Sequence, residues 1–400
     1  MTEMEYNKEK DIQRLHSLDD LIQFVDSNNH RGYDPYDALN SSLLKTISAK
    51  SKWLRILFTQ LLRRLPINIR PILGIRKEHN PKAMGLFLSA YVNLQRLSEN
   101  DEYRDRINFF TDWLIKNSSP GYSGDCWGYN FDWQNREFYA PEGTPTIVNT
   151  AFIAHAFLDA YDLFSDDHYL NTALSACDFI LNDLNIHTED DTHCFSYTPI
   201  DHGRVHNANY LGASLMVRTH SKTGEAYLLK NAVKSYEFSN HYQEDNGAWQ
   251  YGAEGTRQWV DGFHTGFNLE ALDWYRKSTG DDRYTDIMEN GLRFYIENFF
   301  LDDGTPGYYA DSIYPVDIHS AAQAIITLAK LSDLDNRAEL LAQKVLHWTV
   351  TNMMDPDGYF YYRKGRILTN KLPYIRWGQA WMMKALSTYS VLKKLPEEVA

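Results

Sequence analysis

The chain has 400 residues, of which 43% are hydrophobic and 23% are charged, and its formal net charge is −13. This balance predicts a globular protein with a large core, and the lack of a basic stripe argues against nucleic acid as a partner. The sequence contains no run of 18 apolar residues, so no transmembrane helix is predicted, and the polar N-terminus is unlike a signal peptide. Three cysteines without ligand spacing predict neither a disulfide framework nor a metal site, so a cytoplasmic location is expected.

Residues 1–80 are predicted to form an N-terminal helical extension, because they precede the repeat described below. The stretch "SLDDLIQFVDSN" reads as a helix that Ser17 caps. Residues 50–77 mix Leu and Ile with Lys and Arg, a composition typical of an amphipathic helix. We interpret this segment as a helix packed on the main body with its basic face in solvent. Contact with a membrane surface is the alternative.

From residue 81 onward the sequence repeats with a period of about 55–65 residues. Each copy starts with an apolar helix that has a small residue near its beginning. Most copies continue with a short acidic segment that ends in Tyr, such as "DDHY" and "DDRY". A loop with alternating aromatic residues follows, as in W-G-Y, F-S-Y, W-Q-Y and F-Y-Y. The small residues that open the six apolar helices are Gly85, Ala151, Gly212, Gly266, Ala321 and Gly378.

Six helical hairpins of this length predict an all-α closed ring, because each hairpin buries its apolar face only against its neighbours. On these features the chain resembles the (α/α)6-toroid superfamily of carbohydrate-active proteins. That superfamily includes unsaturated glucuronyl hydrolases, N-acylglucosamine 2-epimerases and polysaccharide lyases. The resemblance implies a toroid domain over residues 81–400 that binds a saccharide where the inner helices begin. The sequence contains no P-loop, no Rossmann fingerprint and no H-E-x-x-H motif, so no cofactor is expected.

Two pairs of polar residues precede equivalent inner helices, Asp261 with His264 and Asp317 with His319. An aspartate at these positions is expected as a helix cap, but capping does not require a histidine in both copies. A carboxylate beside an imidazole suits proton transfer near neutral pH. These four residues are therefore predicted to line one polar pocket at the mouth of the ring.

Asp132 lies in "GDCWGYNFDW", where W-G-Y belongs to the repeat and N-F-D-W does not. Trp127 and Tyr129 are therefore predicted to match Trp249 and Tyr251 of a later copy. An aromatic setting is expected to raise the pKa of Asp132 and to suit a general acid facing the central cavity. The alternative is a loop aspartate that accepts hydrogen bonds from nearby backbone amides.

Further polar and aromatic residues near the helix starts are predicted to bind substrate. Arginine forks are expected to hold a substrate carboxylate, and aromatic rings to stack on sugar faces. The predicted substrate-binding residues are Trp127, Tyr129, Asn149, Arg204, His206, Asn207, Tyr251, Trp259, Arg376, Trp377 and Gln379.

Three functions fit these observations. The first is a glycoside hydrolase acting on an acidic or uronic-acid-containing glycan, with Asp132 and Asp261 as paired carboxylates and Asp317 as a substitute. The second is a polysaccharide lyase or a sugar epimerase that uses His264 and His319. The third is a non-catalytic glycan-binding component of polysaccharide assembly.

Overall fold

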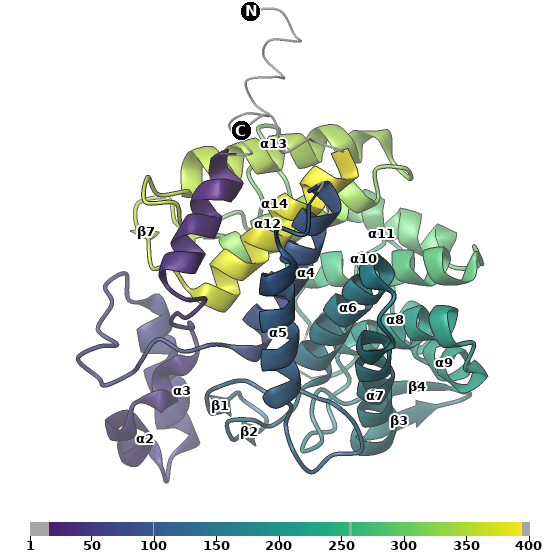
Figure 1. The fold of residues 1–400 in the computed structure, drawn as a ribbon, viewed down its shortest axis with the longest axis horizontal. Coiled ribbons are helices and arrows are strands. Elements are labelled where there is room, and N and C mark those ends of the chain that lie inside the picture. The colour runs from purple at the N-terminus through teal and green to yellow at the C-terminus, as the bar shows by residue number, and fades with distance from the viewer. Residues whose placement is uncertain (1–15, 99, 256–257, 394–400) are drawn as a thin grey trace, which may run out of the picture.

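The computed structural model describes residues 16–98, 100–255 and 258–393, and its centre is a closed ring of six inner helices (Figure 1). Each inner helix packs against the next one, and the last packs against the first, which closes the ring. The six predicted segments are therefore confirmed as helices of one ring. In chain order the inner helices are α4 (Pro81–Leu97), α6 (Ile147–Phe164), α8 (His206–Thr223), α10 (Gly262–Thr279), α12 (Ile318–Lys330) and α14 (Trp381–Lys393), the last preceded by the π-helical turn η2 (Ile375–Ala380).

An outer layer of helices surrounds the ring. Its members are α5 (Arg104–Lys116), α7 (Asp167–Asp183), α9 (Ala226–His241), α11 (Thr285–Asn298) and α13 (Asn336–Met353), each packed on the inner helix that precedes it in the chain. A helix over residues 16–27 occupies the sixth outer position, because Leu18, Leu21 and Val25 belong to the same hydrophobic core as the ring.

The inner helices are buried on nearly all sides, because they form the central layer of the molecule. In α4 every residue from Pro81 to Gln95 is buried, and in α6 every residue from Ile147 to Leu158 is buried. Such helices bury their surface only when they are enclosed by other helices.

Small residues let neighbouring inner helices approach closely. A Cβ atom added to Gly85 would lie 2.6 Å from Cγ1 of Ile153, and one added to Gly212 would lie 2.6 Å from Cδ1 of Ile147. These distances are shorter than real Cβ contacts. At Gly85 the Cα of Ile153 is also close, at 3.1 Å, so a larger residue would displace backbone, whereas at Gly212 the nearest atom is the end of the Ile147 side chain.

The repeated aromatic loops are structurally equivalent, as the sequence predicts. The indole N–H of Trp127 donates to the carbonyl of Leu114, near the end of α5, at 2.8 Å. The indole N–H of Trp249 donates to the carbonyl of Ser239, near the end of α9, at 3.1 Å. Both side chains are buried, so these tryptophans anchor their loops to the preceding outer helix.

Short strands pair within the connecting loops. The pairs are antiparallel and join β1 (Trp133–Gln134) to β2 (Tyr139–Ala140), β3 (Ile186–Glu189) to β4 (Thr192–Phe195), and β6 (Arg363–Lys364) to both β5 (Val316–Asp317) and β7 (Thr369–Asn370).

A small helical unit lies between the helix over 16–27 and α4. It contains η1 (Asp37–Asn40), α2 (Ser42–Ser48) and α3 (Lys52–Arg64). Its own hydrophobic cluster consists of Ala38, Leu44, Leu62 and Ile75. Across the described residues, no helix is both long enough and apolar enough to span a membrane.

Replacing Gly85 by Ala tests the close packing of the ring. The added methyl group meets both the side chain and the Cα of Ile153, so we expect the free energy of unfolding to fall by about 1–3 kcal/mol. Gly378 is the matched control, because a Cβ there makes an ordinary contact of 3.4 Å with Ile318. Urea unfolding of both variants checks this; equal stabilities would contradict the packing argument.

Candidate functional site

The N-termini of the inner helices converge at one mouth, where a tyrosine of each loop completes the helix start. The backbone N–H of the first helical residue donates to the carbonyl of this tyrosine in five of the six helices. The sixth, α4, begins with Pro81, which has no N–H to donate. The five donor–acceptor pairs are Ile147 with Tyr197, His206 with Tyr251, Gly262 with Tyr308, Ile318 with Tyr362, and Ile375 with Tyr33.

Asp261 and His264 form a carboxylate–imidazole pair at the start of α10. Nδ1 of His264 lies 2.6 Å from Oδ2 of Asp261, and the backbone N–H of His264 donates to Oδ1 at 3.0 Å. The indole N–H of Trp259 also donates to Oδ2, at 2.9 Å. Asp261 therefore caps the helix and fixes the ring of His264 with Nδ1 as the protonated nitrogen. Nε2 of His264 has no hydrogen bond to another described residue and is free to act on a ligand.

Aromatic and polar side chains surround this pair. Tyr251 stacks on Trp259 with ring centroids 4.5 Å apart, and its centroid lies 4.6 Å from that of His264. Trp259 is 38% exposed, as expected for a ring that offers one face to a sugar. Asn207 lines the same narrow crevice, which has no room for a water molecule in this structure, and its side-chain oxygen has no hydrogen-bond partner. The structure thus brings together five of the residues that the sequence predicts for the site.

His319 lies deeper in the ring. Its imidazole stacks between Phe263 and Trp381, with each centroid 4.5 Å away. Both ring nitrogens are buried without hydrogen-bond partners, and burial together with the nearby Lys82 holds the pKa of His319 well below its usual range. His319 is therefore uncharged and, unlike His264, presents no nitrogen at the surface of the mouth.

Asp317 does not form a second carboxylate–imidazole pair. Its Oδ1 accepts hydrogen bonds from the backbone N–H of His319 and the indole N–H of Trp377, and its Oδ2 pairs with Nε of Arg363 at 2.6 Å. Asp317 precedes its histidine by two residues, whereas Asp261 precedes His264 by three. Only the longer spacing brings the ring back to the carboxylate, so the two Asp–His motifs differ in structure.

Asp132 is a buried, fully paired carboxylate. Burial alone would raise its pKa, but Lys45 at 2.5 Å, the Tyr139 hydroxyl at 2.6 Å and the backbone N–H of Glu142 hold the pKa below its ordinary value. The raised pKa predicted from its aromatic setting is therefore wrong. Asp132 shares no hydrogen-bond partner with Asp261.

The two arginines predicted to hold a substrate carboxylate are already engaged. Nε and Nη2 of Arg376 donate to the two carboxylate oxygens of Asp34 at 2.6 and 2.8 Å. Arg204 pairs with Glu254 at 2.5 Å. In this structure neither guanidinium group therefore has a pair of N–H donors available to bind the carboxylate of an acidic sugar.

Several other predicted residues have structural contacts. Gln379 holds the backbone of Phe360 by two hydrogen bonds of 2.8 Å. His206 lies between α8 and α9, close to Tyr242 and to the Ser239 hydroxyl, and burial lowers its pKa to about 3. Asn149 is fully buried, and neither its amide oxygen nor its amide nitrogen has a partner, which makes it an unsatisfied polar group at the start of α6.

Sequence reasoning missed Lys82, which lies inside the ring beside His319. Its Nζ lies 4.4 Å from the ring centroid of Phe152 and 5.3 Å from that of Trp381. Among the described residues it has no hydrogen bond or ion pair, and burial holds its pKa well below its usual range. A lysine in the otherwise apolar run "PKAMGLFL" was the available signal.

Tyr36, from the segment before α4, also reaches the mouth. Its ring centroid lies 5.7 Å from that of Trp377, and its hydroxyl accepts a hydrogen bond from Arg63 of α3 at 2.7 Å. The small N-terminal unit therefore forms part of the mouth.

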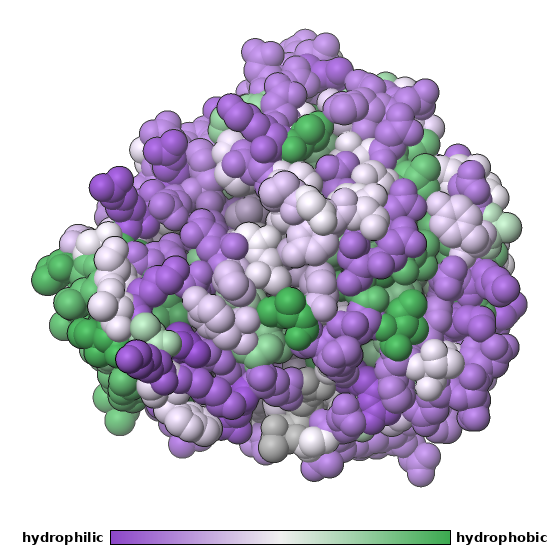
Figure 2. Space-filling view, turned by 90° about the horizontal axis from the view of Figure 1, so that it is seen from below, coloured by the Kyte–Doolittle hydropathy of each residue, from purple (hydrophilic) through white to green (hydrophobic). Residues whose placement is uncertain are grey.

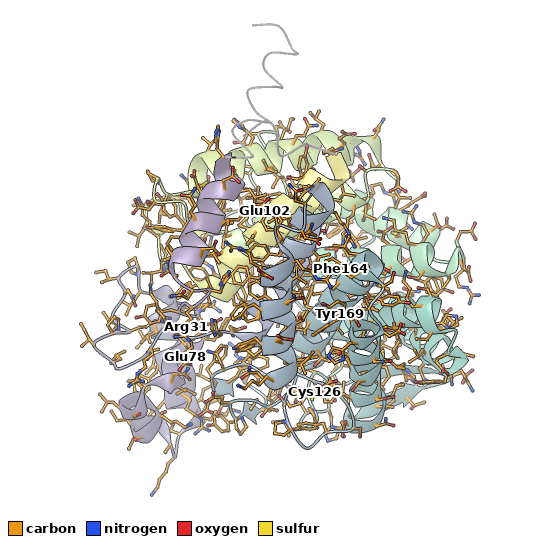
Figure 3. The ribbon with its side chains drawn as sticks, viewed as in Figure 1. Arg31, Glu78, Glu102, Cys126, Phe164 and Tyr169 are labelled. Atoms are coloured by element: carbon orange, nitrogen blue, oxygen red, sulfur yellow. The ribbon has the colours of Figure 1, made fainter. Side chains whose placement is uncertain are left out.

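A wider groove of about 520 Å³ lies on the outside of the ring beside the first loop. Arg31 and Glu78 line it and lie near each other in Figure 3. Glu142 lines it too, and burial, with further repulsion from Glu78 and Asp132, raises its pKa. Among the described residues, no group of three or more His, Cys, Asp or Glu side chains is placed to hold a metal ion.

Comparisons with known proteins identify the fold. No family model matches the sequence, and no curated protein matches it significantly. Solved structures do match: cellobiose 2-epimerase from Bacillus thermoamylovorans is 13% identical, with a TM-score of 0.65 over 80% of this chain and 90% of that one. An unsaturated glucuronyl hydrolase specific for heparin is 13% identical, with a TM-score of 0.60 over 97% and 98%.

A glycoside hydrolase family 76 α-mannanase from Bacteroides thetaiotaomicron is also similar, at 13% identity and a TM-score of 0.60 over 79% of this chain and 87% of that one. These neighbours are carbohydrate-active enzymes with different reactions. The resemblance to the (α/α)6 toroid is thus confirmed as a fold, and the reaction has to be argued from the site.

The buried, uncharged state of His206 predicts how stability depends on pH. The unfolded chain protonates this histidine near pH 6.5, whereas the folded protein holds its pKa at about 3. Unfolding therefore takes up a proton below pH 6.5, and stability falls as the pH drops. We expect the stability difference between the wild type and His206→Gln to decrease by about 1.4 kcal/mol per pH unit from pH 6 to pH 4. Urea unfolding at several pH values measures this, and a constant difference would contradict it.

Proposed function

We propose that this chain is a carbohydrate-active enzyme that transfers a proton on its sugar substrate, as in epimerisation or elimination, with His264 as the base. The observation that carries the proposal is the 2.6 Å contact between His264 and Asp261 at the mouth of the ring. The carboxylate fixes the tautomer that leaves Nε2 unprotonated, and it stabilises the imidazolium that forms when Nε2 takes a proton.

The surroundings of His264 support a saccharide as the substrate. Tyr251 and Trp259 form a stacked aromatic platform beside the imidazole, and aromatic faces commonly carry sugar rings through their apolar C–H surfaces. Asn207 adds an amide oxygen without a partner in the same pocket. The inner-helix N-termini add positive potential, which favours the negative charge that develops when a carbon next to a carbonyl loses its proton.

Proton transfer by histidine fits the mouth better than hydrolysis by the predicted carboxylate pair. Hydrolysis requires one carboxyl group that donates a proton and a second carboxylate across the scissile bond. Asp132 forms an ion pair with Lys45, and Asp317 forms one with Arg363. Asp261 instead accepts hydrogen bonds from His264 and Trp259. The similarity to a cellobiose 2-epimerase is consistent with this choice but concerns the fold alone.

Substitution of the pair tests the proposal. His264→Gln removes the base, and Asp261→Asn keeps an N-cap but removes the charge that orients the ring. We expect each to reduce kcat by roughly 100-fold or more, because general bases contribute 10²–10⁴-fold. The assay follows deuterium uptake from D₂O, new ultraviolet-absorbing ends and cleavage products with cellobiose, a heparin-derived unsaturated disaccharide and α-mannan.

The control for this experiment is His220→Gln, near the C-terminal end of α8 and away from the mouth, where Nδ1 hydrogen-bonds to the backbone carbonyl of Glu225. Thermal unfolding of all variants separates loss of activity from loss of fold. Turnover of a glycan that is unaffected in both His264→Gln and Asp261→Asn would exclude His264 as the base.

Glycoside hydrolysis in the outer groove is the second candidate function. Glu142 has the raised pKa that a general acid needs, and Glu78 supplies another carboxyl group in the same groove. If this groove is the site, Glu142→Gln should reduce glycan cleavage by roughly 100-fold, and activity should fall as the pH rises through the pKa of Glu142.

The matched control is Glu102→Gln, which does not line this groove and lies well above Arg31 and Glu78 in Figure 3. Reducing-end release from α-mannan measures both variants. Cleavage that survives in Glu142→Gln would remove the groove from consideration and leave the mouth as the site.

A further inference from the structure

Helix α3 turns a row of apolar side chains toward solvent. Trp53, Leu57 and Leu61 recur every four residues, so they share one face of the helix. They are 68%, 48% and 50% exposed. The sequence-based interpretation, in which this segment buries its apolar side and leaves a basic face in solvent, therefore describes only part of the helix. Leu62 packs inward, whereas the Trp53 row does not.

Neighbouring segments extend this row into one face. Leu43 and Ile47 of α2, and Ile67 and Ile72 after α3, are each more than half exposed. The tip of the β6–β7 hairpin adds two exposed residues, and Asn370 of β7 joins the hairpin to α3 through a 3.1 Å bond to the carbonyl of Leu65. Hydrophobic atoms gather at the left of Figure 2, on the side where Figure 1 places α2 and α3. The apolar members of this face are Leu43, Ile47, Trp53, Leu57, Leu61, Ile67, Ile72, Ile367 and Leu368.

The same stretch is strongly basic, although the whole chain has a net charge of −13. Residues 42–77 contain no Asp or Glu. The side chains of Lys50, Arg64 and Arg76 are exposed and make no hydrogen bond or ion pair with another described residue. The nine basic residues of this stretch are Lys45, Lys50, Lys52, Arg55, Arg63, Arg64, Arg70, Arg76 and Lys77.

We propose that this basic apolar face binds the surface of an anionic lipid bilayer, with its apolar residues among the headgroups and its cations at the phosphates. Exposed apolar patches of this extent mark interaction sites, and an amphipathic helix with Trp, Leu, Lys and Arg is typical of segments that lie in a membrane interface. A second copy of the chain fits less well, because an isologous contact would place the same unbalanced cations against each other.

The face adjoins the mouth of the ring. Arg63 of α3 donates to Tyr36 at the mouth, and Lys45 of α2 pairs with Asp132. A bilayer bound here would lie beside the site through which a saccharide enters. The binding itself does not depend on the proposed function, and the test below uses no substrate.

Vesicle flotation with the full chain tests the proposal. The probes are vesicles of phosphatidylcholine alone and of phosphatidylcholine mixed with an equal amount of phosphatidylglycerol. We expect binding to the anionic vesicles only, and weaker binding as salt is added, because salt screens exposed charges. The double variant Leu57→Ser/Leu61→Ser and the double variant Lys50→Glu/Arg64→Glu should each weaken binding by about tenfold or more.

The matched controls are Leu340→Ser, an exposed leucine on α13 that is 57% exposed, and Lys116→Glu at the end of α5. Both should bind vesicles as the wild type does. Absence of binding at low salt, equal binding to neutral vesicles, or unchanged binding by both double variants would overturn the proposal. Light scattering that shows a dimer in the wild type and a monomer in Leu57→Ser/Leu61→Ser would overturn it in favour of a second copy.

Discussion

A backbone hydrogen bond from the first residue of an inner helix to the carbonyl of the repeated tyrosine ties each hairpin together at the mouth. Five of the six inner helices begin in this way, and Pro81 replaces the donor in the sixth. The bond satisfies a helix-terminal N–H that would otherwise be orphaned, and it fixes the tyrosine loop over the helix start. The inner helices are buried on nearly all sides, and the closed ring with its outer layer supplies the neighbours that cover them.

This construction decides which polar residues are available for chemistry. Buried charges have to be paired, and most of those at the mouth are: Asp34 with Arg376, Asp317 with Arg363, and Asp132 with Lys45. His264 differs because its partner orients the ring and leaves the second nitrogen free. Asn149 and His319 remain without hydrogen-bond partners inside the ring, as expected where a bound ligand or water completes the hydrogen bonds.

The sequence predicts the ring well because its signals are local and repeated. The period, the small residues at close helix contacts and the equivalence of Trp127 with Trp249 follow from patterns that recur in every hairpin. The repeat was taken to begin at residue 81, although "RGY" at residues 31–33 places Tyr33 in the same role as the later tyrosines. This outer helix and its tyrosine loop precede all the other repeats in the chain and are far in sequence from their inner helix, so the period of the repeat does not identify them.

The site is less predictable from the sequence, because the charge and hydrogen bonding of its residues depend on contacts with residues far away in the chain. Arg376 was predicted to bind substrate, yet it is held by Asp34, which is 342 residues away in sequence. Asp132 was expected to have a raised pKa in an aromatic setting, but Lys45 from α2 pairs with it and lowers that pKa. The face of α3 illustrates the same limit, since periodicity shows that a helix is amphipathic but not which side packs on the body.

The central claim is that a saccharide binds at the mouth and meets His264, whose Nδ1–H is held by Asp261 and whose Nε2 faces the ligand. Nitrogen NMR of histidine-labelled protein tests this claim directly, with cellobiose, the heparin-derived disaccharide and α-mannan oligosaccharides as ligands. The account predicts the Nδ1–H tautomer for His264 and a shift of its Nε2 signal when a saccharide binds, both absent in Asp261→Asn. A saccharide that binds without moving the His264 signals, or a free His264 in the Nε2–H tautomer, would contradict it.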